Sequence, residues 1–539
     1  MKRRNFLHTT AALSAATALM PSFLKGKTFF DVIPNEKIAG FEGDSITIII
    51  EMFGGNDGLN TIIPLHDEKR YLELRPNINV PKELAKNFNN LDLFLHPNLV
   101  DGVQNGGFIK MLQEGKLAIV EGIGYENPNL SHFRSEELWL SGINTANDKQ
   151  SFYEVWLGRF IANRLPNYPI EIPEHPIAMQ IGGQINLMLK SNKGDMGIAL
   201  SDPTEFYNLG NGLTPIVPAK TGTTNFDNEF NFVHALGRQS DMYSQAVYNA
   251  YNAGKGKLKA TYSGGYLSQQ LKLIASLIAG GLKTKVYFIK LNTNFDTHVQ
   301  QTNGDSTTGQ HPAMLSNVAS GICDFMLDSQ LQGWSERVAG FTFSEFGRRA
   351  YENGSRGTDH GAGSMLFAFG DSKYLNSGFY GEKPNLADFS VDPKGLDENG
   401  NLRYQFQYQR VYVDFLENWF NATSDEIKAV FGTTYLPMGL LKKRTVDVES
   451  TETMTNNNFF KLYPNPTSGE FNVSFELTKN SNVFAAIYDV SGSEHNVFLN
   501  GNLTGGNYNL PISITTNGNY FVNIVVNGKR YVTKISVVK

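Results

Sequence analysis

The chain has 539 residues, of which 41% are hydrophobic and 18% charged, so it can bury a large core and is long enough for more than one domain. Its 47 basic and 52 acidic residues give a formal net charge of −5, and no basic stripe follows the sequence, which excludes nucleic acid as an expected partner. A lone cysteine, Cys323, excludes a thiolate metal site and an intrachain disulfide framework, and its apolar neighbours predict a buried core position.

Residues 1–27 have the features of an export signal. Lys2, Arg3 and Arg4 precede a weakly apolar, Ala- and Thr-rich run that is shorter than the ~20 residues a spanning helix needs, so we expect it to be cleaved. The Arg-Arg-x-Phe-Leu pattern resembles signals of the twin-arginine pathway, which moves folded proteins; an ordinary signal with two basic residues is the alternative. No other segment is long and apolar enough to cross a membrane.

Strand-like and helix-like segments alternate through residues 28–445, which predicts an α/β fold with a mixed sheet flanked by helices. The stretch 195–223 is rich in Asn, Gly and Thr and is expected to be a loop. Strands are expected at 45–51, 117–121, 285–291 and 338–343, and helices at 106–113, 229–253, 265–280, 306–335 and around 407–412.

Two polar motifs in the first third of the chain carry possible chemistry. The turn at 54–58 follows the first expected strand and can present Asp57 as a metal carboxylate, although the same residues also suit an ordinary turn. It lacks the spacings of nucleotide-binding glycine loops. Ser131 and His132 begin an expected helix, where Ser131 is either an N-cap or a nucleophile activated at the helix terminus.

Three further clusters follow expected strands in the second half. Asp296 and His298 come after the strand at 285–291, residues 343–349 follow the strand at 338–343, and Asp359 and His360 lie just downstream. Loops at the carboxyl ends of strands converge on one crevice in an open α/β sheet. Carboxylate and imidazole groups suit divalent metals, and the arginines at 348 and 349 can hold a tetrahedral anion. Each cluster alone fits a turn or a surface ion pair, but three together indicate a site.

These segments together resemble the uncharacterised DUF1501 family over residues 40–440, which is similar in fold to the alkaline phosphatase and sulfatase superfamily. The resemblance implies Ser131 as nucleophile candidate, with His132 and Arg348 as further catalytic residues. Glu345 stands where those enzymes carry an Asp-His pair, so fewer ligands are implied for a second metal. The implied metal ligands are Asp57, Asp296, His298, Glu345 and His360, and the resembling segments are 51–60, 131–139, 156–159, 294–298, 344–348 and 357–361.

The C-terminal part differs from the rest of the chain in composition and in hydrophobic pattern. A polar linker is expected at 446–458, and short alternating strands punctuated by Gly and Asn follow in 459–539, which predicts a small β-sandwich. Residues 462–469, 487–492, 518–522 and 534–539 resemble the type IX secretion sorting domain of Bacteroidetes. That resemblance implies transport across the outer membrane; a binding sandwich is the alternative.

The expected protein is therefore an exported, metal-dependent hydrolase of phosphate or sulfate esters with an alkaline-phosphatase-like domain at 28–445. Zinc is the expected metal, with calcium, magnesium or manganese as alternatives. The expected partners are a small-molecule or glycan ester and the twin-arginine and type IX export machineries, and the expected location is secreted or at the cell surface. The alternative function is a non-catalytic metal-binding or glycan-associated surface protein with the same fold.

Overall fold

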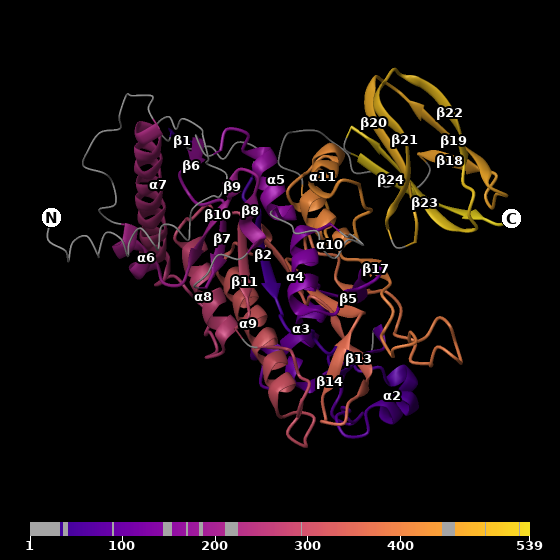
Figure 1. The fold of residues 1–539 in the computed structure, drawn as a ribbon, viewed down its shortest axis with the longest axis horizontal. Coiled ribbons are helices and arrows are strands. Elements are labelled where there is room, and N and C mark those ends of the chain that lie inside the picture. The colour runs from indigo at the N-terminus through magenta and orange to yellow at the C-terminus, as the bar shows by residue number, and fades with distance from the viewer. Residues whose placement is uncertain are drawn as a thin grey trace. The chain divides into compact units, whose positions relative to one another are not determined.

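A computed structural model describes most of the chain, and it divides into two compact units, residues 1–405 and 406–539 (Figure 1). The predicted export signal and the predicted linker lie outside the described residues. None of the described helices is long and apolar enough to cross a membrane. The described residues are 33–35, 41, 43–88, 91–143, 154–168, 171–182, 187–210, 225–292, 294–444, 459–490, 492–527 and 529–539.

A large mixed sheet forms the centre of the first unit, as predicted. Its strands run in the order β10-β7-β11-β2-β12-β15-β5-β16. The neighbours from β10 to β12 pair in parallel, β15 is antiparallel to both β12 and β5, and β16 is parallel to β5. The strand bounds are β2 Ile46–Glu51, β5 Leu117–Gly124, β7 Ala178–Ile181, β10 Gly197–Leu200, β11 Val286–Lys290, β12 Val338–Phe343, β15 Ser364–Gly370 and β16 Gly378–Tyr380.

The central strands are continuous apolar runs because both faces of the sheet are covered. Alternate residues of β2, namely Ile46, Ile48 and Ile50, join one core with residues of helices α3, α8 and α9, where Cys323 is also buried. Helix α4 contacts β12, with the rings of Trp139 and Phe343 stacked at 5.4 Å between centroids. The helices are α2 Glu68–Leu74, α3 Gly107–Gln113, α4 His132–Ser141, α5 Trp156–Arg164, α6 Pro203–Gly210, α7 Asn225–Gly254, α8 Tyr266–Ala279 and α9 Gln310–Gln332.

The stretch expected to be a loop at 195–223 contains regular structure instead. Strand β10 (Gly197–Leu200) extends the sheet by pairing with β7, and helix α6 (Pro203–Gly210) follows it. The Asp202 side chain accepts hydrogen bonds from the backbone N–H groups of Thr204 and Glu205, both at 2.8 Å, so it caps the helix start that the loop-like composition concealed. Residues 211–224 of this stretch lie outside the described part.

The second unit contains helices and a two-sheet sandwich. Helix α10 (Gln409–Asp414) confirms the predicted helix, and α11 (Ser424–Phe431) begins with a capping box formed by Thr423 and Glu426. The sheets have the orders β18-β19-β22 and β21-β20-β23-β24, and their inner residues form one core. The strands are β18 Phe460–Tyr463, β19 Glu470–Leu477, β20 Ser481–Tyr488, β21 Glu494–Leu503, β22 Gly506–Ser513, β23 Gly518–Val526 and β24 Lys529–Val537.

Candidate metal centre

Four segments meet at the carboxyl ends of the central parallel strands. Asp296 lies on the loop after β11, and Glu345 comes just after β12. Helix α4 brings His132 as its first residue. A two-stranded hairpin of β13 (Gly347–Glu352) and β14 (Thr358–Gly361) places Arg348 and His360 opposite each other in register. The predicted convergence of loops at this edge of the sheet therefore brings these residues together.

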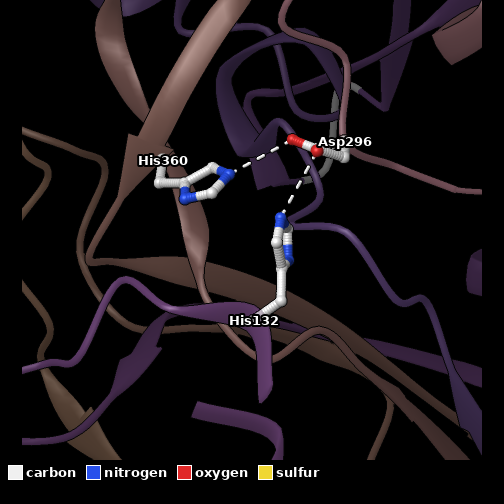
Figure 2. Close-up of side chains that lie close together, drawn as sticks. All are labelled: His132, Asp296 and His360. Carbon is white, nitrogen blue, oxygen red and sulfur yellow. Dashed lines mark hydrogen bonds and ion pairs between the residues drawn. The ribbon is translucent and has the colours of Figure 1, made fainter. Parts of the chain in front are cut away.

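The Asp296 carboxylate is the centre of the cluster. Its Oδ1 lies 3.0 Å from His298 Nε2 and 3.2 Å from His360 Nε2, and its Oδ2 lies 3.4 Å from His132 Nε2. Figure 2 shows the rings of His132 and His360 approaching Asp296 from different elements. Partial burial opposes ionisation, but the Arg348 guanidinium lowers the pKa of Asp296, so the carboxylate is negative near neutrality.

Each of the three imidazoles is anchored through its other nitrogen. His132 Nδ1 lies 2.6 Å from Glu345 Oε1, His298 Nδ1 lies 3.1 Å from Asp359 Oδ1, and His360 Nδ1 lies 2.8 Å from the carbonyl oxygen of Leu130. A carbonyl or a carboxylate can only accept a hydrogen bond, so each Nδ1 is the donor. In a neutral imidazole the lone pair is then on Nε2, which faces Asp296.

The donor set fits a divalent metal. One ligand atom each from His132, Asp296 and His360 lies within 4.8 Å of the others. His132 Nε2 is a buried nitrogen without a hydrogen-bond partner among the described residues, which a metal ion would satisfy. Burial lowers the pKa of His360, which favours the neutral, ligating form of its ring. Imidazole and carboxylate donors together are the ligands of zinc sites in proteins.

Glu345 and Arg348 are buried residues that contact this cluster through His132 and Asp296. Besides His132, the Glu345 carboxylate accepts the backbone N–H of Gly54 at 2.8 Å, so it holds the His132 ring in place. The buried Arg348 guanidinium donates to Asp296 Oδ1 at 2.6 Å and to backbone carbonyls that include those of Gly55 and Thr358. Arg348 is thus bonded to oxygens of the chain at each of its three nitrogens, which fits a positioning role better than the predicted anion clamp.

Asp57, predicted as a metal ligand, lies in a separate buried network. Its Oδ2 accepts from Arg75 at 2.6 Å and from Gln301 Nε2 at 2.5 Å. Arg75 also binds Asn60 Oδ1 at 2.7 Å, so Asn60 is held inside this network too. Burial opposes ionisation of Asp57, but Arg75 lowers its pKa overall. Gln301 in turn accepts a hydrogen bond from the Thr297 hydroxyl. Thr297 lies between Asp296 and His298, so this network helps to fix the loop that carries both residues.

The hydroxyl candidates on α4 differ in their surroundings. Ser131 occupies the N-cap position, is exposed, and makes no side-chain capping hydrogen bond in the described helix. It lies between Leu130, which anchors His360, and His132, so its backbone is part of the site. Ser135 is buried, and its Oγ donates to the Glu345 carbonyl oxygen at 2.5 Å, which leaves Ser131 as the accessible hydroxyl.

Sequence reasoning did not assign the anchoring carboxylate of Asp359, although its place beside His360 was a usable signal. It also did not assign His132 as a ligand, because a histidine that opens a helix has no spacing to another ligand. Lys290 and Glu51, at the ends of β11 and β2, were read only as strand residues.

The comparisons with known proteins come from two family models and from solved structures. Residues 244–431 match the model described as "Protein of unknown function (DUF1501)", and residues 461–539 match "Secretion system C-terminal sorting domain". The second match identifies a protein secreted through the type IX system, to the cell surface or the extracellular space. No curated protein matches the chain.

Three solved structures are similar at low identity. A protein in the alkaline phosphatase superfamily from Vibrio parahaemolyticus is 10% identical, with 94% of this chain and 91% of that chain covered and a TM-score of 0.29. The lipoteichoic acid synthase LtaP from Listeria monocytogenes is 7% identical, with 69% and 72% covered and a TM-score of 0.24. A putative lipoprotein from Bacillus anthracis is 17% identical, with 17% and 88% covered and a TM-score of 0.11.

Proposed function

Since the chain is a secreted protein with a DUF1501 region and a C-terminal sorting domain, we propose that it is a metal-dependent hydrolase of phosphate or sulfate esters. The observation that carries the proposal is the arrangement of three anchored imidazoles around Asp296. With Nδ1 donating to an acceptor, a ring in its neutral form has its Nε2 lone pair directed toward the negative Asp296 carboxylate. This contact is favourable when a cation lies between them.

His132, Asp296, His298 and His360 are the residues proposed to hold the metal. When bound, a zinc ion supplies Lewis-acid polarisation of an ester oxygen and lowers the pKa of a coordinated hydroxyl. The chain's own residues set the geometry. Glu345, Asp359 and the Leu130 carbonyl fix the ring orientations, and Arg348 fixes one oxygen of Asp296.

Ser131 is the proposed nucleophile. Its hydroxyl is exposed at the start of α4, where the backbone N–H groups and the helix dipole favour negative charge. The neighbouring His132 is fixed by Glu345, so the Ser131 backbone is held beside the site. We expect Ser131→Ala to lose at least about 100-fold in turnover while metal binding is retained, and Ser131→Thr to keep part of the activity. Full turnover by Ser131→Ala would contradict the nucleophile assignment.

The test of the function is turnover of aryl phosphate and aryl sulfate by the full chain after reconstitution with zinc. The proposal predicts turnover of at least one substrate, its loss on chelation, and recovery on adding metal back. Asp296→Ala is expected to lose both metal and activity, whereas Asp305→Ala, in an exposed loop of the same unit, keeps both. A wild-type chain that binds metal but turns over neither ester class would instead support the non-catalytic, metal-binding surface protein.

A further inference from the structure

A second charged constellation lies beside the histidine cluster at the same edge of the sheet. Glu51 ends β2 and Lys290 ends β11, and the two residues are partners in the parallel pairing of these strands. Glu136 lies on α4, one turn after His132. Lys290 Nζ lies 2.6 Å from Glu136 Oε1 and 3.4 Å from Glu51 Oε1. The ammonium also lies over the Phe53 ring, 3.9 Å from its centroid.

Glu51 is the unusual member of this group. Its side chain is 0% exposed, and neither carboxylate oxygen has a hydrogen-bond partner among the described residues. Burial, Glu136 and Glu345 raise the pKa of Glu51 well above its usual value, and Lys290 opposes them only in part, so full ionisation of Glu51 needs a further compensating cation. An ionised carboxylate without hydrogen bonds is costly to bury unless a cation compensates it. Both Glu51 oxygens are therefore available to bind a cation. The Lys290 ammonium, 3.4 Å from Oε1, is the cation beside them.

Lys290 is held in its charged form by the same residues. Burial lowers the pKa of Lys290, but Glu51 and Glu136 raise it more, so the net shift is upward. The Lys290 side chain is 30% exposed, against 12% for Glu136 and 0% for Glu51, so it is the most exposed member of the group. Two carboxylates with oxygen-only donors are the kind of site that a hard, hydrated divalent cation occupies.

We propose that Glu51 and Glu136 form a second cation site, separate from the histidine cluster, in which the Lys290 ammonium is the resident cation. Beside the proposed metal centre, the chain thus holds a fixed positive charge at the same edge of its sheet. It follows that removal of the ammonium converts this place into a binding site for a divalent cation. This inference goes beyond the proposed hydrolase function, because it concerns side chains that are not among the proposed metal ligands.

The test uses Mn²⁺ and the full chain with Asp296→Ala, so that the histidine cluster is disabled. Bound Mn²⁺ is counted by electron paramagnetic resonance. We expect no bound Mn²⁺ for Asp296→Ala alone and about one per chain when Lys290→Ala is added. Lys290→Arg in the same background keeps a cation and is expected to bind none. Adding Glu51→Gln to the Lys290→Ala chain removes a ligand, and the bound Mn²⁺ is expected to disappear.

A Lys290→Ala chain that folds and binds no Mn²⁺ would overturn the inference, as would binding that persists in Glu51→Gln. Thermal melts cover the case in which Lys290→Ala folds poorly, since the proposal predicts that Mn²⁺ raises its melting temperature and leaves that of Lys290→Arg unchanged. A chain that stays unfolded at every Mn²⁺ concentration would also contradict it. A wild-type chain without ester turnover would refute the proposed function alone, because the Asp296→Ala background does not depend on it.

Discussion

The three imidazoles of the candidate metal centre are anchored by acceptors of different strength. Glu345 is 0% exposed, whereas Asp359 is 45% exposed and its charge is screened by solvent. Hydrogen bonds from Asn353 and His298 lower the pKa of Asp359 despite partial desolvation, so Asp359 is an ionised acceptor. The buried acceptor is also fixed by the Gly54 N–H, so it constrains its histidine more tightly. His132 is therefore the ligand whose orientation depends most on its carboxylate.

Glu345→Gln is expected to lower zinc affinity about 10- to 100-fold, because removing an outer carboxylate weakens both the orientation and the basicity of its histidine. Asp359→Asn is the matched variant and should have a smaller effect, since its carboxylate is half exposed. Competition with a chelating dye measures both dissociation constants. An Asp359→Asn effect equal to or larger than that of Glu345→Gln would contradict this ranking.

For individual residues, the sequence predicted the site where the functional side chains lie close to a strand in the chain. Asp296 and His298 could be found because they follow a buried strand within a few residues, and His360 was assigned through the family resemblance. Asp57 has the same local signal, yet its carboxylate pairs with Arg75, on the helix-and-turn segment that returns to it. That pairing depends on tertiary packing, so the spacing of residues along the sequence does not predict it. The assigned roles of individual side chains remain predictions until metal binding is measured.

Among the structural elements, the turn after β2 has the tightest fit. Gly54 has φ +117°, and a Cβ there would lie 2.2 Å from Asn294 Oδ1 and 2.3 Å from the backbone nitrogen of Asp296. The same residue donates its N–H to Glu345. The turn therefore lets the Asp296 and Glu345 segments approach each other, which no residue with a side chain permits.

We expect Gly54→Ala to abolish high-affinity zinc binding and to lower the melting temperature, because the added methyl group would push the Asp296 loop away. Gly304→Ala is the matched control. It also has a positive φ, +81°, but a Cβ there meets nothing within 4 Å, so its cost is limited to backbone strain of about 1 kcal/mol. Isothermal titration with zinc and thermal melts compare the two. Zinc affinity in Gly54→Ala equal to that in Gly304→Ala would refute the close-approach argument.

For the whole molecule, hydrophobic periodicity predicted the long elements well. The strands β2, β5, β11 and β12 and the helices α3, α7, α8 and α9 lie within a few residues of the expected ranges, and each contributes apolar side chains to the same core. Helix α6 and strand β10 were missed because they are short and lie in a stretch that is rich in Asn, Gly and Thr as a whole, and packing against neighbours stabilises them. The predicted boundary at 445 and the predicted linker fall outside the described residues, which resume at residue 459, and the domain boundaries remain a prediction.

Acid is expected to destabilise the first unit through two buried histidines. Burial lowers the pKa of His311 to about 3 despite the nearby Asp57, and lowers that of His96 to about 4. The unfolded chain takes up these protons below about pH 6.5, whereas the folded chain does not. Stability is therefore fully present above about pH 6.5 and decreases as the pH falls toward 3 to 4, by at most about 1.4 kcal/mol per pH unit for each histidine.

His311→Gln should flatten this dependence, because glutamine does not titrate. The melting temperature of the metal-free wild type should exceed that of the variant most at pH 7, and the difference should narrow by pH 4.5. His495→Gln, in the second unit, is the control and should leave the dependence of the first unit unchanged. A wild-type advantage that stays constant with pH would show that His311 does not contribute to acid sensitivity.

The central claim is that three anchored histidines and Asp296 bind a metal ion. Zinc K-edge absorption spectroscopy of the full wild-type chain, reconstituted with one equivalent of zinc, tests it most directly. The account predicts a shell of nitrogen and oxygen ligands only, at about 2.0–2.1 Å, with the multiple-scattering signature of imidazole rings. This shell should be lost in Asp296→Ala and kept in Asp305→Ala. A wild-type chain that retains no zinc, or whose zinc shows no imidazole signature, would contradict it.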